Sequence, residues 1–213
     1  SGVREVLRRR LDRLPEQTIA LLSTLALLSR PAPVSLLSAV TGMDEDSALD
    51  GCEAAVLAGL LIDDAGSGGF GLTHDLVRQT LVEALSPARA MRLHARIGDA
   101  LRAPGGPHSP ERVVEIAHHL TRAAPIVGDS AVPYLLTAAD DAFIRVASRS
   151  AEQYLITALE LTSALPQSAD RVLRTAEIRA RLMAGRLIAS SGDQSVAPTA
   201  LVEPGAVAPI DPD

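Results

Sequence analysis

The chain has 213 residues, of which 47% are hydrophobic and only 2% aromatic, and its formal net charge is −6. Because Leu and Ala must supply most of the core, this composition favours packed helices over a β-sandwich or a barrel. The acidic balance argues against non-specific DNA binding, and the absence of a long apolar run and of a signal peptide predicts a cytoplasmic protein without a membrane segment.

Residues 1–85 begin with a series of helices whose limits are marked by proline, glycine and aspartate. Apolar spacing predicts helices over Val3–Leu14, from Pro15 to Leu28, and over Val34–Val40 with Gly42 after it. Asp44 or Asp46 opens the next helix. We expect this helix to end at Gly59 and to bury four side chains, those of Leu49, Cys52, Val56 and Leu57.

A hairpin follows these helices, with Leu60–Asp64 and Phe70–Thr73 as its strands and a glycine-rich turn between them. Several helices followed by a hairpin is the order of a winged helix, so residues 1–85 are predicted to form such a module. Its recognition helix would carry only acidic charges: Asp44, Glu45, Asp46, Asp50 and Glu53. DNA phosphates would repel this helix, and we expect no direct DNA binding by this part of the chain.

The remainder of the chain is predicted to be helical up to a polar tail. Residues 86–128 form a helical connector, after a helix over His74–Leu85, with helices over Pro87–Leu101 and Pro110–Ala123. Residues 129–189 contain two antiparallel helices rich in small residues and a further helix over Asp170–Leu187, which is typical of tetratricopeptide-like repeats. Residues 190–213 are rich in Ser, Gly, Pro and Ala and are predicted to be disordered.

The inward faces of the two repeat-like helices can be assigned from the same spacing. The first face comprises Tyr134, Leu135, Ala138, Ala139, Ala142, Phe143 and Val146, and the second comprises Ser150, Ala151, Tyr154, Leu155, Ala158, Leu159 and Leu161. So few repeats would not be stable alone. Because the chain also starts at Ser1 rather than Met, we interpret it as a piece of a longer protein in which the array continues.

His74 and Asp75 are the first candidates for a binding site, because they stand where the second strand meets a helix. The Asp75 carboxylate is expected to cap that helix by accepting the free amide protons of its first turn. His74 lies where backbone amides and the positive end of the helix favour an anion such as a phosphate. A purely structural function for the pair is the alternative.

Other candidate residues have simpler interpretations. The single cysteine, Cys52, is expected to be a buried bystander. Glu115, His118 and His119 are candidate metal ligands, and Glu115 and His119 share a helix face; without a third clustered ligand we expect packing rather than a metal site. His94 is expected at an interface. The chain lacks lysine, which a phosphate loop requires, and shows no catalytic triad or acid pair, so this chain is not predicted to be an enzyme.

Several short segments, in a fixed order, resemble the region that follows the nucleotide-binding domain in STAND-class ATPases (signal-transduction ATPases with numerous domains). The likeness is greatest to bacterial LuxR-family transcriptional regulators. The strongest segment is Phe70–Arg78, and the others are Val3–Pro15, Leu57–Leu61, Arg92–His94 with Ile97, Ala100 and Leu101, Ala117–Leu120 and Tyr154–Leu161.

This resemblance implies a winged helix that works inside a nucleotide switch. In related switch ATPases a His-Asp motif contacts the β-phosphate of ADP, which implies that His74 makes this contact and that Asp75 positions it; Thr73 stands where immune members usually have Met. The implied partners are an upstream ATPase domain of the same protein and a signal protein or small molecule on the repeats. ATP or ADP would bind the longer protein, and no cofactor is expected in this segment alone. A DNA-binding winged helix and a plain interaction scaffold are the alternatives.

Overall fold

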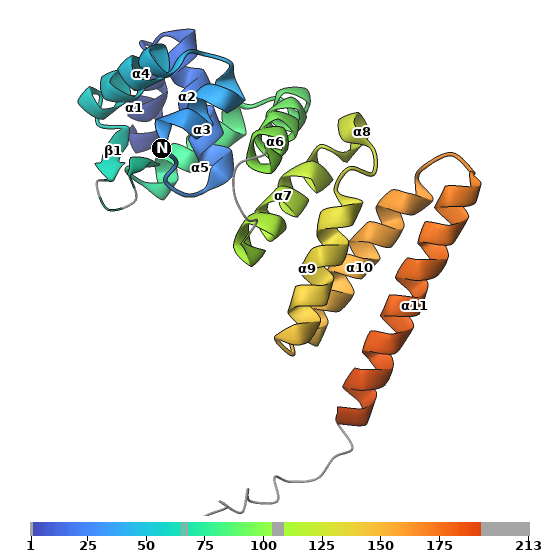
Figure 1. Cartoon of the computed structure of the whole chain (residues 1–213). Helices are drawn as coiled ribbons and strands as arrows, with labels where there is room; N and C mark the ends of the chain where they lie inside the picture. The colour runs from blue at the N-terminus through green and yellow to red at the C-terminus, as the bar shows by residue number, and fades with distance from the viewer. Residues whose placement is uncertain (1, 65, 67, 104–108, 193–213) are drawn as a thin grey trace, which may run out of the picture.

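The structure is a computed structural model that describes residues 2–64, 66, 68–103 and 109–192. Over these residues it is mainly helical with one small two-stranded antiparallel sheet, as the sequence predicts. Figure 1 shows an N-terminal bundle that runs from α1 to α5, followed by a row of neighbouring helices with α11 at its outer edge.

The N-terminal bundle is built around α2 (Glu16–Leu28). Its Leu21, Leu22 and Leu25 are almost completely buried. The helices packed around it are α3 (Val34–Thr41), α4 (Glu45–Leu57), α5 (Asp75–Ala84) and α6 (Pro87–Arg102). The remaining helix of the bundle, α1 (Gly2–Leu11), lies on α5. Leucine burial on one central helix therefore supplies much of the hydrophobic stabilisation of this bundle.

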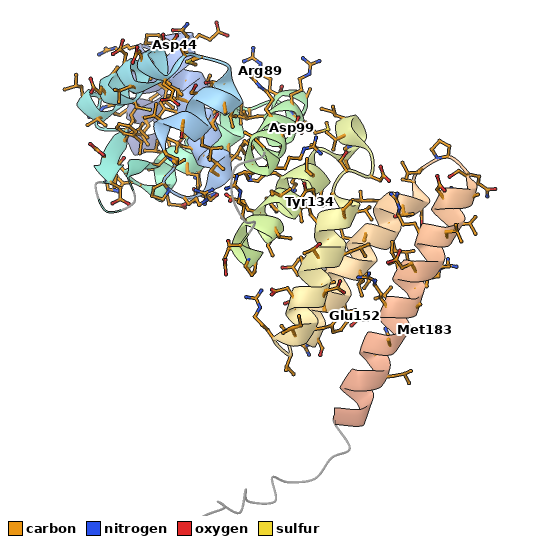
Figure 2. All side chains as sticks on the ribbon, in the orientation of Figure 1. Asp44, Arg89, Asp99, Tyr134, Glu152 and Met183 are labelled. Atoms are coloured by element: carbon orange, nitrogen blue, oxygen red, sulfur yellow. The ribbon has the colours of Figure 1, made fainter. Side chains whose placement is uncertain are left out.

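Local chemistry determines where these helices begin and end. Pro15 precedes α2, where its fixed φ suits a helix start and its missing N–H is not needed. Gly42 ends α3 with a φ of 78°, a left-handed conformation that glycine adopts at little cost. Asp44, labelled in Figure 2, caps α4 because its carboxylate accepts a hydrogen bond from the Ser47 amide at 2.8 Å.

The hairpin consists of β1 (Leu61–Asp64) and β2 (Gly69–Leu72), with Leu61 opposite Leu72. Ala32, in the break between α2 and α3, forms an isolated antiparallel bridge with Phe70 through two backbone hydrogen bonds of 3.0 and 2.9 Å. Gly69 permits this approach, since a Cβ atom there would lie 2.4 Å from the Ala32 carbonyl oxygen. The break between α2 and α3 is thereby fastened to the hairpin, beside the end of α2.

Close helix contacts continue in the C-terminal half. α6 packs on α7 (Pro110–Arg122), where Gly98 lies against Leu120, and α7 packs on α9 (Val132–Ile144). A short helix, α8 (Ala124–Val127), which the sequence analysis did not predict, lies between α7 and α9. α10 (Ser148–Ser163) packs on α9 and on α11 (Ala169–Gly192). Small residues dominate the buried surface of α9 and α10: Ala138, Ala139, Ala142, Ala151 and Ala158.

The predicted inward face of α4 is partly wrong. Leu49 and Leu57 are 39% and 91% exposed, whereas Ala48, Cys52 and Ala55 are buried. The cause is a close approach to α2, since a Cβ atom at Gly51 would lie 2.6 Å from the Leu21 side chain. The narrow space between α2 and α4 accommodates small side chains and excludes leucine side chains.

The predicted faces of the repeat-like helices need a smaller correction. Val146 is 84% exposed because it follows the end of α9 in a left-handed conformation, with a φ of 58°. Ser150 is also exposed, one residue before the buried Ala151. The other residues of both faces are buried or partly buried.

α11 extends beyond its predicted end at Leu187 to Gly192, so the helix includes the first residues of the predicted tail. The rest of that tail, residues 193–213, lies outside the described residues. None of the helices in the described part is both long enough and apolar enough to cross a membrane.

Candidate functional site

His74 and Asp75 lie at the junction between β2 and α5, as predicted, but Asp75 does not cap the helix. His74 is the residue before the helix, with extended backbone angles and no capping hydrogen bond from its side chain. Asp75 is instead the first helical residue, and its carboxylate accepts hydrogen bonds from Arg78 Nε at 2.8 Å and Gln79 Nε2 at 2.6 Å. The hydrogen bond from Arg78, and to a smaller extent that from Gln79, lowers the pKa of Asp75. Asp75 therefore positions Arg78.

A small pocket of about 220 Å³ opens beside this junction. Its walls come from three parts of the chain, namely the end of α2 with the break after it, the hairpin, and the start of α5. The lining residues are Leu25, Ser29, Arg30, Pro31, Ile62, Gly71, Leu72, His74, Asp75 and Arg78. The Ala32–Phe70 bridge and Gly71, whose Cβ would lie 3.2 Å from the Pro31 side chain, hold the hairpin against the break after α2.

The polar groups of this pocket favour an anion. Arg30 and Arg78 contribute two guanidinium groups and His74 an imidazole, against the single carboxylate of Asp75. Guanidinium groups present paired N–H donors that match phosphate oxygens. His74 and Asp75 were predicted from the sequence, and neither arginine was. Arg78 carried a local signal, because it stands one helical turn after Asp75, whereas Arg30 is distant in sequence.

Arg30 also connects the pocket to the C-terminal half. Its Nε and Nη2 atoms donate to the two carboxylate oxygens of Glu115 on α7, both at 2.8 Å. Glu115 is the more buried partner, with 19% of its side chain exposed against 43% for Arg30. Glu115 is therefore engaged in an ion pair with Arg30. Among the described residues, no group of three or more His, Cys, Asp or Glu side chains could hold a metal ion.

The predicted interface histidine, His94, pairs with His119 between α6 and α7. Their Nδ1 atoms lie 2.8 Å apart, and His119 is only 1% exposed. Burial lowers the pKa of His94 to about 4 and that of His119 to about 3. His118 touches both rings edge-on from the exposed side of α7. These residues form a neutral packing contact and do not line the pocket.

Cys52 is fully buried in α4, as predicted. Burial raises the pKa of its thiol to about 11, so the reactive thiolate is almost absent at neutral pH. This thiol is therefore not a candidate nucleophile.

No protein-family model, curated protein or solved structure matches this chain. The functional interpretation therefore depends on the geometry of the pocket and on the contacts that connect it to the rest of the molecule.

Proposed function

We propose that this chain is a non-catalytic regulatory segment of a STAND-type ATPase, in which it couples the nucleotide state of an upstream ATPase domain to a helical-repeat sensor. The observation that carries this proposal is the pocket at the junction of β2 and α5, where His74 lies with the guanidinium groups of Arg30 and Arg78. Part of the pocket wall, which includes His74, Asp75 and Arg78, belongs to the segment whose resemblance to that family is strongest. It would receive the β-phosphate of ADP held by the ATPase domain.

A winged-helix interpretation of the N-terminal bundle supports this proposal. α2, α3 and α4 precede the hairpin, and the Ala32–Phe70 bridge adds a third extended segment to β1 and β2. α4, in the position of a recognition helix, carries acidic residues and no arginine or lysine. A helix of this charge is repelled by DNA phosphates, so we assign the module to contacts inside the protein.

Arg30 gives the proposed switch a physical link between its two ends. The same guanidinium lines the pocket and holds Glu115 of α7. A phosphate in the pocket would compete with Glu115 for this cation. The Arg30–Glu115 contact would then differ between nucleotide states, and such a difference is what allows a ligand to shift an equilibrium between conformations.

The helices α9, α10 and α11 would form the start of the sensor array. α9 and α10 pack through small side chains, and α11 is fixed to both, to α9 by an Arg181–Asp140 ion pair and to α10 by an Arg186–Glu152 ion pair. α11 exposes Leu173, Met183 and Leu187, each 69% accessible, and Met183 is labelled in Figure 2. Such a face suits the next helix of an array. It equally suits a protein partner, which is the observation that favours the alternative of an interaction scaffold.

The experiment that tests the proposal measures the nucleotide retained by the purified full-length protein. We expect ADP to co-purify with the natural sequence and to be reduced at least tenfold in His74→Ala and in Arg30→Gln. Arg179→Gln serves as the matched control, because Arg179 is an exposed arginine of α11. Equal amounts of ADP in all variants would show that the pocket does not contribute to nucleotide binding, and would favour the interaction scaffold. No nucleotide in any of them would refute the proposal as a whole.

A further inference from the structure

A second and larger hollow, of about 780 Å³, lies on the N-terminal bundle and shares no lining residue with the pocket around His74. It is bounded by α1, α2, α5 and α6, together with the turn between α1 and α2 and the end of α3. Ligand sites of small molecules typically enclose about 300–1,000 Å³. This hollow, which we call the α1–α6 groove, is large enough for one such molecule.

The floor of the α1–α6 groove is apolar. Leu11 of α1 and Leu81 of α5 are buried there, and Ile19 and Leu93 are partly buried beside them. An apolar body that covered these side chains would remove hydrophobic surface from water, at about 25 cal/mol for each Å² buried. The floor therefore favours the hydrocarbon part of a ligand.

Buried hydroxyl groups add polar atoms to the same surface. Thr24 and Thr80 line the groove, and each donates its proton to a carbonyl of its own helix, Ala20 and Leu76 respectively. Ser23 is only 5% exposed, and its hydroxyl makes no hydrogen bond to another described residue. The Ser23 hydroxyl is therefore available to hydrogen-bond to a polar atom of a bound molecule.

Arginines form the rim of the α1–α6 groove. Arg89, Arg92 and Arg96 recur along α6 at the spacing of one helix face, and Arg8 of α1 faces the same hollow. Figure 2 shows Arg89 on the first part of α6, beside the N-terminal bundle.

The charge of this rim is only partly neutralised. Among the described residues Arg8, Arg89 and Arg92 have no ion-pair partner, and Arg96 donates to the Thr41 carbonyl at 2.6 Å, which does not neutralise it. Two carboxylates, Asp12 and Glu16, also line the groove, so the arginines outnumber the acids. An excess of unpaired guanidinium groups beside an apolar floor favours a carboxylate or phosphate head group.

From these observations we infer that the α1–α6 groove binds a small amphipathic anion, which places an apolar body on the leucine floor and its anionic head between Arg89 and Arg92. This site is independent of the proposed nucleotide pocket. It also differs from the exposed face of α11, where the described residues form no comparable group of unpaired arginines around the apolar side chains.

Decanoate is a suitable probe, because it joins one carboxylate to a short hydrocarbon chain and can be used below its micelle-forming concentration. Its binding to the full chain is measured by titration calorimetry, and amide chemical shifts locate the site. The cationic analogue decyltrimethylammonium has the same apolar tail and tests the requirement for an anion. We expect one decanoate per chain, shifts that centre on α2, α5 and α6, and at least tenfold weaker binding of the cation.

Substitutions test separately the contributions of the arginine rim and of the groove itself to decanoate binding. Arg89→Gln with Arg92→Gln should weaken decanoate binding at least tenfold, and Ala84→Trp, at an exposed lining position, should block it by filling the groove. The control Arg179→Gln removes an arginine from α11 and should change the affinity less than twofold. Equal binding of the anion and the cation, an unchanged affinity in the double variant, or shifts confined to other helices would overturn the inference. Binding of an acidic helical peptide without binding of decanoate would overturn it as well.

Discussion

The Nδ1–Nδ1 hydrogen bond between His94 and His119 requires that one ring donates a proton and the other accepts it. The two imidazoles must therefore adopt opposite tautomers while both are neutral. Burial is the main reason for their low pKa values, and nearby cationic groups add to it: Arg122 beside His94 and Arg30 beside His119. The pair is thus stable in its uncharged form and opposes protonation.

This pair predicts a loss of stability on mild acidification. The pKa in the unfolded chain is about 6.5, above the folded values, so between pH 7 and pH 5 the unfolded state binds more protons and the free energy of unfolding falls. We expect a decrease of roughly 2–4 kcal/mol between these pH values, with up to about 2 kcal/mol from each histidine, measured by urea denaturation. His119→Asn, whose amide can reach the position of Nδ1 without titrating, should reduce the decrease by about half.

His74→Gln is the control for this prediction, because His74 is an exposed histidine outside the contact between α6 and α7. Carboxylates do not account for the effect, since those of Asp44, Asp75 and Glu111 have pKa values below their ordinary range and titrate at lower pH. A free energy of unfolding that is the same at pH 7 and pH 5 would show that the histidine pair is not held neutral.

Gly69 allows the hairpin to pack against the break after α2. An added Cβ would meet backbone atoms only, the Ala32 carbonyl oxygen at 2.4 Å and the Pro33 nitrogen at 2.8 Å. Gly69→Ala is therefore expected to separate the hairpin from the break after α2 and to cost roughly 1–3 kcal/mol in urea denaturation. Gly66→Ala, whose Cβ would lie 3.3 Å from the Asp64 side chain, should cost much less. Equal effects of the two substitutions would contradict the prediction.

At the scale of elements, the contact between α6 and α7 depends on a missing side chain. A Cβ at Gly98 would lie 2.5 Å from Leu120 Cδ2 and 2.9 Å from its Cγ, and Leu120 is fully buried. Gly98→Ala improves helix propensity by up to about 1 kcal/mol but crowds a packed core, and we expect a net destabilisation of roughly 1–2 kcal/mol.

A double-mutant cycle isolates this contact. Leu120→Ala alone should cost about 2–5 kcal/mol because it leaves a cavity, and Gly98→Ala should partly refill that cavity in the double variant. The free energies of unfolding, measured by thermal and urea denaturation, should therefore be non-additive by about 1 kcal/mol or more. Additive effects would mean that the two helices separate in solution.

Most helices could be predicted from the sequence because their signals are local. The apolar period gives their positions, and Pro15, Gly42 and Asp44 mark their ends through backbone geometry and capping. The buried face of α4 could not be predicted in the same way. It depends on how closely α2 approaches, and this distance comes from Gly51 against Leu21, a contact between two helices that periodicity does not report.

Across the whole molecule, the residues of the candidate site differ in whether a local sequence pattern could predict them. His74 and Asp75 have a local signal, since they stand between a strand and a helix. Arg30 has none, because it enters the pocket only when the break after α2 is fastened to the hairpin through Ala32 and Phe70. When tertiary contacts assemble a site, only those of its residues that have a local sequence signal can be predicted from the sequence.

The contact between Arg30 and Glu115 spans both halves of the described chain, and it predicts an effect on anion binding. Glu115→Gln removes the carboxylate that holds the Arg30 guanidinium, so Arg30 becomes more available to the pocket. We expect the affinity of the full chain for pyrophosphate, measured by calorimetry, to rise by up to about fivefold, because a partly exposed ion pair contributes up to about 1 kcal/mol. Arg30→Gln should lower the affinity instead.

The control for this last prediction is Glu152→Gln, which breaks the ion pair with Arg186 between α10 and α11, away from the pocket. It removes the same charge from the molecule, so any general effect of net charge on anion binding should appear there too. A higher affinity in Glu115→Gln alone would identify Glu115 as a competitor for Arg30. Equal increases in both variants would reduce the effect to net charge, and the contact would then serve only to hold α7 against the end of α2.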